Sequence, residues 1–81
     1  MITDIGEYVR VKAVFSRGRV EILAVMWNGR LIPVRQVTHR WETREGKFPL
    51  YHFAAVSDGM VMELCLDPVR LSWTLDRIHT Q

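Results

Sequence analysis

Hydrophobic and polar residues alternate along most of this chain, in short runs separated by turn residues. A period of two is typical of strands that bury one face, and the runs are rich in the β-branched and aromatic residues that strands favour. We predict strands at about residues 7–15, 19–27, 30–41, 50–57, 60–67 and 70–79. No stretch combines helical spacing of apolar residues with capping residues, so the pattern predicts an all-β protein.

Glycine-containing turns join several of the predicted strands. Asn28-Gly29 predicts a tight hairpin, because both central positions of a type I′ turn need positive φ. Asp58-Gly59 follows the same logic, and Gly18 suits a bulged hairpin loop. Within residues 30–41 the apolar phase shifts once near Arg35-Gln36, which predicts a β-bulge.

Residues 42–49 are polar and show no apolar period, so we expect them to form the longest and most mobile loop. Six short antiparallel strands then make a meander, and a small meander hides its edges best by curling into a closed or partly open barrel. An SH3-like barrel is the alternative. At 81 residues the chain is too short for two cores, so we predict one domain at 7–79, a flexible N-terminus at 1–6 and a tail at 80–81.

The predicted strand at 19–27 is apolar on both faces apart from Glu21. If Ile22 and its neighbours in phase face the core, then Leu23, Val25 and Trp27 form an apolar outer face. Such a face is typical of a contact between identical subunits, and it raises the possibility of a homodimer.

Groups that could carry catalysis or bind metal are few. Cys65 is the single cysteine and lies between two leucines, where a small packing residue is expected. His39, His52 and His79 stand far from it and from one another in the sequence, without a paired ligand motif. Nucleophile-elbow and glycine-rich phosphate-loop motifs are absent. We therefore predict no enzymatic activity, no cofactor and no metal site.

The chain has no apolar run of membrane-spanning length, and its start lacks the basic and apolar regions of a signal peptide. One cysteine cannot form an intramolecular disulfide, which fits a reducing compartment. These features predict a cytoplasmic protein that does not bind membranes.

Basic residues gather in the first half of the chain. Residues 8–40 contain seven Lys and Arg residues and one acidic residue, whereas residues 41–81 contain four basic and six acidic residues. Basic strand faces with interleaved aromatic residues bind single-stranded nucleic acid or acidic proteins, or simply keep strand edges soluble. The first and third predicted strands can both flank the second, and they carry the candidate contact residues. These are Tyr8, Arg10, Lys12, Arg30, Arg35, Arg40 and Trp41.

Turn and packing landmarks extend over about residues 8–79. They are Trp27-x-Gly29-Arg30, Val34, Val37, Arg40-Trp41, Tyr51, Asp58-Gly59, Glu63-Leu64, Asp67-Pro68 and Trp73-x-Leu75-x-Arg77-Ile78. Together they resemble a small bacterial domain of unknown function that occurs beside, or fused to, error-prone Y-family DNA polymerases. The resemblance implies a DNA-repair context and identifies no activity or binding residue.

We therefore expect a non-catalytic interaction module that contacts a DNA polymerase or another repair protein, or binds DNA in a weak and salt-sensitive way, through its Arg-bearing strands. The alternative is a self-associating structural module without a nucleic-acid role.

Overall fold

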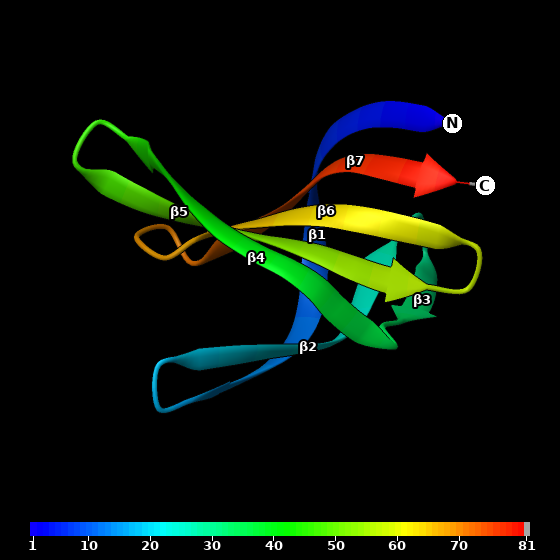
Figure 1. Cartoon of the computed structure of the whole chain (residues 1–81), viewed down its shortest axis with the longest axis horizontal. Coiled ribbons are helices and arrows are strands. Elements are labelled where there is room, and N and C mark those ends of the chain that lie inside the picture. Colours follow the sequence, from blue (N-terminus) through cyan, green and yellow to red (C-terminus); the bar gives the residue numbers. More distant parts are fainter. Residues whose placement is uncertain (81) are drawn as a thin grey trace.

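The computed structural model describes residues 1–80, most of which lie in strands (Figure 1). The strands are β1 (Ile2–Ser16), β2 (Arg19–Trp27), β3 (Arg30–Pro33), β4 (Gln36–Glu45), β5 (Phe48–Ser57), β6 (Met60–Asp67) and β7 (Ser72–Thr80). They form one antiparallel sheet in the order β3-β2-β1-β7-β6-β5-β4. The all-β prediction is confirmed, whereas the predicted number of six strands is wrong because the sheet has seven.

The additional strand arises within the predicted strand at residues 30–41, which the structure divides in two. β3 ends at Pro33 and β4 begins at Gln36. The change of apolar phase near Arg35 therefore marks a break in the strand, and the register shift of this segment lies three residues further on, at Thr38 in β4. Pro33 has no amide hydrogen with which to extend the ladder, which favours a strand end at this position.

The short connection between β3 and β4 forces the sheet to curl. These strands occupy opposite edges of the sheet, which in a flat sheet with a spacing of about 4.8 Å would lie roughly 29 Å apart. The three Cα steps from Pro33 to Gln36 span at most about 11 Å. The sheet therefore bends round until its two edges approach each other, as Figure 1 shows.

Val34 and Arg35 link the two edges through their backbone. The amide of Val34 donates a hydrogen bond to the carbonyl oxygen of Leu23 in β2, at 2.9 Å. The amide of Arg35 donates to the carbonyl oxygen of Val56 in β5, at 2.8 Å. Because β3 and β4 do not pair with each other, the curled sheet is not closed by hydrogen bonds.

A register shift at Leu23 changes which side chains of β2 face the interior. Ile22 and Ala24 pair with consecutive residues of β1, so Leu23 has no partner in that ladder. Ile22 and Val25 are consequently both buried, and Leu23 is exposed. The predicted apolar outer face is therefore wrong, because Val25 is fully buried and Trp27 packs against the core.

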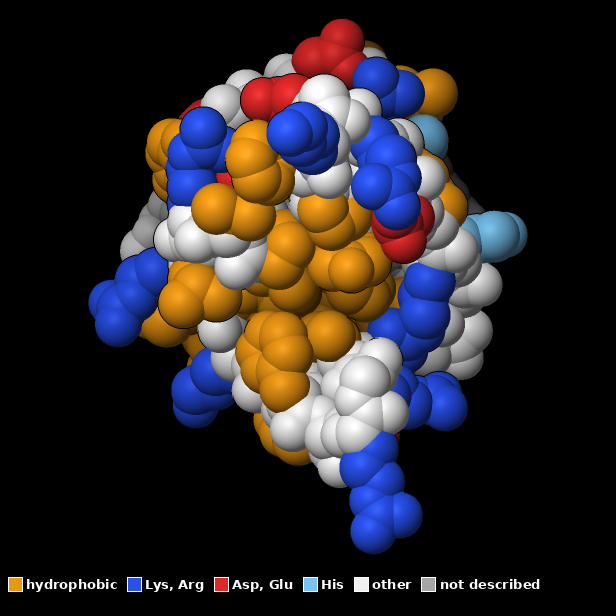
Figure 2. Space-filling view, turned by 90° about the vertical axis from the view of Figure 1, so that its left-hand side faces the viewer, with side chains coloured by type: hydrophobic (Ala, Val, Ile, Leu, Met, Phe, Trp, Pro, Cys, Tyr) orange, Lys and Arg blue, Asp and Glu red, His pale blue; other side chains and the backbone are white. Residues whose placement is uncertain are grey.

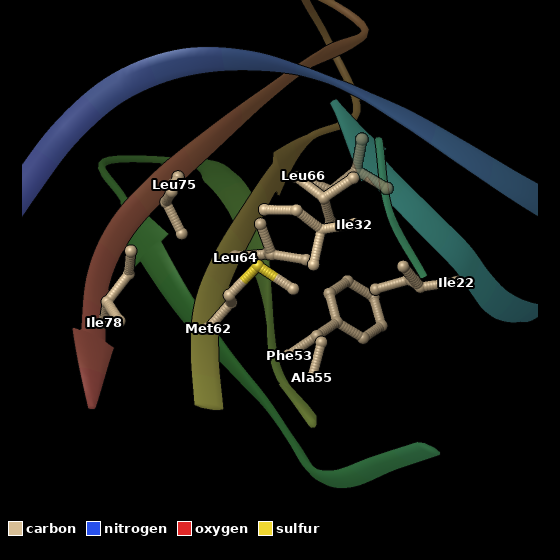
Figure 3. Packing of buried hydrophobic residues seen from close by; sticks show 10 residues of the cluster. Ile22, Ile32, Phe53, Ala55, Met62, Leu64, Leu66, Leu75 and Ile78 are labelled. Carbon is tan, nitrogen blue, oxygen red and sulfur yellow. The ribbon is translucent and has the colours of Figure 1, made fainter. Parts of the chain in front are cut away.

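The core fills the inside of the curl (Figure 3). Its buried members are Ile22, Val25, Ile32, Phe53, Ala55, Met62, Leu64, Leu66, Leu75 and Ile78. Alternate residues of β6 supply three of them, as the period of two predicts. Among these side chains Leu64 has no exposed surface, and it pairs with Phe53 on one side and Leu75 on the other.

The tight turns confirm one sequence prediction and correct two. Asn28 and Gly29 have φ values of 52° and 70°, as a type I′ turn requires. Arg17 and Gly18 also both have positive φ, so this turn has the same two-residue form and is not a bulged loop. At Asp58-Gly59 the positive φ belongs to the glycine alone, so this turn is not of type I′.

The β4–β5 connection is much shorter than the sequence predicts. Residues 42–49 do not form a long loop, because β4 continues to Glu45 and pairs with β5 from Phe48 onward. β4 is an edge strand whose side chains are almost all exposed. Residues 42–45 at the end of β4 are all polar, which hides this part of the strand from a prediction based on apolar alternation.

Both ends of the described chain belong to the sheet. β1 pairs with β7 from Ile2 onward, and the amino group of Met1 donates to the carbonyl oxygen of Thr80 at 2.7 Å. The predicted flexible segment at residues 1–6 is therefore largely a strand. The predicted tail begins inside β7, which ends at Thr80, and Gln81 lies outside the described residues.

Asp67 organises the loop between β6 and β7. Its Oδ1 accepts hydrogen bonds from the backbone amides of Val69, at 2.9 Å, and Arg70, at 3.1 Å. The Arg70 guanidinium donates to Oδ2 at 2.8 Å. The side chain and then the backbone amide of Arg70 hold the pKa of Asp67 below its usual value.

Replacing Leu64 with alanine should destabilise the protein by about 2–5 kcal/mol, because the change leaves a cavity at a fully buried position. Urea-induced unfolding measures this loss. Leu31→Ala is the matched control, since Leu31 is half exposed and its truncation should cost far less. Equal losses in the two variants would contradict the assignment of the core.

Acid should remove the stabilisation that Asp67 provides. Because the pKa of Asp67 is lower in the folded than in the unfolded chain, its contribution is present above the unfolded pKa and is lost as the pH falls through the folded pKa. Asp67→Asn should therefore be less stable than the wild type at neutral pH, and the difference should shrink on acidification. Urea unfolding across the acidic range measures it.

Asp58→Asn is the control for this experiment. Asp58 pairs with Arg35 at 2.7 Å, but both side chains are highly exposed, and such pairs contribute little to stability. A pH-independent difference between wild type and Asp67→Asn would contradict the expected role of Asp67.

Candidate functional site

A hollow opens at the end of the curled sheet where the β1–β2 turn, the β4–β5 pair and the β6–β7 loop meet. Its volume of about 690 Å³ lies within the range of roughly 300–1,000 Å³ that is typical of ligand sites. Figure 2 looks onto this end and shows hydrophobic side chains at its centre, with Lys and Arg side chains around them. We call it the Arg-rimmed hollow, and the lining residues that matter below are Phe15, Arg17, Arg19, Arg40, Trp41 and Tyr51.

Three aromatic side chains at the Arg-rimmed hollow are exposed. The exposed fractions are 61% for Phe15, 40% for Trp41 and 37% for Tyr51. Tyr51 shares a face of β5 with the buried Phe53, but it lies closer to the open end, beyond the packed core. Phe15 and Tyr51 provide flat apolar surfaces on which a planar ligand can stack, whereas the Trp41 ring stacks on His52, its ladder partner.

Arg40 is held firmly at the edge of the hollow. Its Nη1 donates to the carbonyl oxygen of Val20 at 2.7 Å, across the gap between β4 and β2. Its guanidinium carbon lies 5.5 Å from the centre of the Phe53 ring, within the range of a cation–π interaction. Arg40 therefore joins the edge strand β4 to β2 and also brings a positive charge to the hollow.

The β1–β2 turn carries two further cations. Arg17 and Arg19 are exposed and flank Gly18. Among the described residues that line the hollow, Glu42 is the only acidic one, and it already pairs with Arg44 at 3.5 Å. Three arginines and one neutralised carboxylate give the hollow a positive potential, which favours an anionic ligand.

The structure gathers only part of the predicted contact set at this hollow. Arg40 and Trp41 line it. Tyr8, Arg10 and Lys12 are exposed on β1 but do not line it.

The other two predicted arginines lie elsewhere. Arg30 lines a second hollow that is bordered by the chain ends and the β2–β3 turn. Arg35 lies in the β3–β4 connection and forms its ion pair with Asp58. The sequence places all the candidate contact residues on predicted strands that flank β2. This placement holds for Arg30 in β3 but is wrong for Arg35 and Arg40, because they follow the break between β3 and β4.

The sequence prediction missed Phe15, Arg17, Arg19 and Tyr51 as candidate site residues. The sequence does contain one signal for three of them, since a Ser-Arg-Gly-Arg turn directly follows Phe15. A basic turn beside an aromatic strand end is a simple pattern for a surface that binds anions and planar groups. Nothing local identifies Tyr51, which joins the site only through the curl of the sheet.

A second group of side chains lies on the outer face of the sheet, and one of its members, His52, also lines the Arg-rimmed hollow. His52 in β5, Cys65 in β6 and Asp76 in β7 offer potential metal ligands that all lie within 4.8 Å of one another. Cys65 is the direct ladder partner of His52, which places both side chains on one face. Their wide separation in the sequence therefore does not keep them apart in the structure.

Two residues of β4 hold the His52 ring in place. The hydroxyl of Thr43 lies 2.6 Å from Nε2, at hydrogen-bond distance. The Trp41 ring stacks on the imidazole with 5.2 Å between the ring centres and 8° between the planes. The other ring nitrogen, Nδ1, faces Asp76 Oδ2 at 3.9 Å.

The Cys65 thiol is poorly suited to nucleophilic chemistry in this state. Burial raises its pKa, and the nearby carboxylate of Asp76 raises it further. A buried thiol with a raised pKa stays protonated near neutral pH, whereas cysteine-dependent catalysis needs a thiolate. The neighbouring imidazole therefore does not by itself make a catalytic pair with Cys65.

No protein-family model, curated protein or solved structure matches this chain. Among the described residues, none forms a helix of the length and apolar character needed to cross a bilayer.

Proposed function

We propose that this chain is a non-catalytic interaction module, a partly open β-barrel, that binds single-stranded nucleic acid at the Arg-rimmed hollow. The observation that carries the proposal is the meeting of exposed aromatic rings with three arginines around one apolar floor. Surfaces of this composition bind single strands by stacking bases on the rings while cations neutralise the phosphates.

Different residues of the hollow take different roles in this proposal. Arg17 and Arg19 contact phosphates, because the β1–β2 turn carries them into solvent. Phe15 and Tyr51 offer rings for stacking. Arg40 contributes charge from a fixed position, since Val20 and Phe53 already engage its guanidinium group.

The shape of the hollow favours a single strand over a duplex. An unpaired base can enter a concave apolar site, whereas a duplex keeps its bases stacked inside. The resemblance to a domain found beside Y-family DNA polymerases makes DNA the first nucleic acid to test. Contact with a polymerase or another repair protein stays a prediction from that resemblance.

The charge of the hollow should determine the salt dependence of binding. For a fluorescent oligo-thymidine, affinity should fall as salt rises, and Arg17→Gln with Arg19→Gln should weaken binding. The slope of log affinity against log salt should become shallower by about 1.4, since each phosphate contact on a single strand contributes about 0.7. Fluorescence anisotropy at several salt concentrations measures both quantities.

The matched control removes two positive charges elsewhere. Arg10→Gln with Arg30→Gln has the same change in net charge, but neither residue lines the hollow. It should retain most of the affinity and nearly all of the slope. If both double variants behave alike, the hollow is not the binding site, and absence of binding at low salt would refute the proposed function.

The aromatic part of the site makes a second prediction. Tyr51→Ala should weaken oligo-thymidine binding by about 1–3 kcal/mol through the loss of one stacked base. Tyr8→Ala is the control, because Tyr8 is more exposed than Tyr51 but does not line the hollow. Anisotropy titrations in which the two variants lose equal affinity would argue against stacking at Tyr51.

A further inference from the structure

The outer face of the sheet carries a group of side chains that the proposed nucleic-acid site does not require. His52 Nδ1 or Nε2, Cys65 Sγ and a carboxylate oxygen of Asp76 lie within 4.8 Å of one another. We propose that His52, Cys65 and Asp76 form a binding site for a divalent transition-metal ion, with zinc as the best match. Imidazole, thiolate and carboxylate are the donors that zinc uses in proteins.

The pairing of three neighbouring strands brings these ligands together. His52 and Cys65 are ladder partners in β5 and β6. The register between β6 and β7 shifts next to Glu63, and this shift leaves Asp76 without a ladder partner. Asp76 is two residues from Thr74, the β7 partner of Cys65, so its side chain reaches the same face.

The distances are close to those that a bound ion needs. Around tetrahedral zinc, nitrogen, sulfur and oxygen ligands lie roughly 3.3–3.6 Å from one another, given metal–ligand distances of about 2.0–2.3 Å. His52 Nδ1 and Asp76 Oδ2 are already 3.9 Å apart. The Asp76 side chain is 40% exposed and can rotate toward the other two ligands.

Groups around the cluster orient two of the proposed ligands. A metal-bound histidine usually donates its other ring N–H to an acceptor, and the Thr43 hydroxyl lies 2.6 Å from Nε2. With Nε2–H donating to Thr43, Nδ1 is free of its proton and faces the cluster. The Thr74 hydroxyl donates to Asp76 Oδ1 at 3.1 Å, which leaves Oδ2 toward His52.

A comparison on the same face shows why a simple polar pair does not explain the cluster. His79 and Glu63 are directly hydrogen-bonded, so each satisfies the other. His52 Nδ1 and Asp76 Oδ2 are 3.9 Å apart, too far for a hydrogen bond, and Cys65 lies on the strand between theirs. An ion that coordinates all three groups would displace the Cys65 thiol proton to solvent, and the fourth tetrahedral position would remain for water or another ligand.

The experiment uses the full chain, without a histidine tag and after treatment with a chelator. Titration with Co²⁺ should produce the intense visible absorption of a tetrahedral site, together with a thiolate-to-cobalt charge-transfer band, at one ion per chain. Addition of Zn²⁺ should displace the cobalt and remove both signals. Calorimetric titration with Zn²⁺ gives the affinity independently.

Variants then identify the ligands. Cys65→Ser should abolish the charge-transfer band, and His52→Gln and Asp76→Asn should each weaken binding strongly. Thr43→Val should weaken it by about 10–100-fold, as expected for loss of a group that orients a ligand. His79→Gln is the control and should bind like the wild type, because it removes a histidine of the same face outside the cluster.

Circular dichroism and urea unfolding establish that each variant is folded. If Cys65→Ser does not fold, the partly exposed His52 and Asp76 variants decide the question. The proposal is overturned if the wild type binds neither ion at one per chain, or if cobalt binds without a thiolate band. It is also overturned if His79→Gln loses as much affinity as His52→Gln.

Discussion

Val34 and Arg35 connect opposite edges of a seven-stranded sheet, and the rest of the structure depends on how short that connection is. A connection of two residues cannot span the distance between the edges of a flat or gently twisted sheet. The sheet therefore curls until the backbone amides of these two residues can donate hydrogen bonds to β2 and to β5. The curl gives the chain an inside that one layer of side chains can fill. It is how the described residues 1–80 obtain a core without a second sheet or a helix layer.

The same curl separates two kinds of chemistry. Aromatic rings and arginines meet at the open end of the curled sheet, beyond the packed core. His52, Cys65 and Asp76 meet on the outer face. Trp41 and His52 belong to both places, because both line the Arg-rimmed hollow and their rings stack on each other. Ligands at the two places would therefore share a side chain, and any effect of one on the affinity of the other would be reciprocal.

Local sequence signals predicted those parts of the fold that local physics determines. The bounds of β2 and β6 agree with the predicted strands, and Asn28-Gly29 adopts the predicted turn. A change of apolar phase located the disturbance near Arg35 but could not distinguish a bulge from a strand break. The bulge at Leu23 left no sequence signal, because β2 is apolar on both faces and either phase looks equally suitable.

The sites were less predictable because they depend on pairing between distant segments. Arg40 and Trp41 were found among the predicted contact residues, but Tyr51 joins them only after the sheet curls. His52 and Cys65 become neighbours through a ladder register, which sequence spacing does not reveal. The resemblance to a domain beside Y-family DNA polymerases concerns turns and packing residues, and its functional implication stays a prediction.

The pairing of β1 with β7 has a consequence for how the chain folds. β1 to β3 form one run of sequential hairpins and β4 to β7 form another, and the β1–β7 ladder is the one that joins the two runs. Each run can form early from local contacts, but the joining ladder must wait for ends that are nearly the whole chain apart. Such contacts carry a high loop-closure entropy and slow folding. During synthesis the two runs would therefore remain separate, with their apolar faces uncovered, until β7 has left the ribosome.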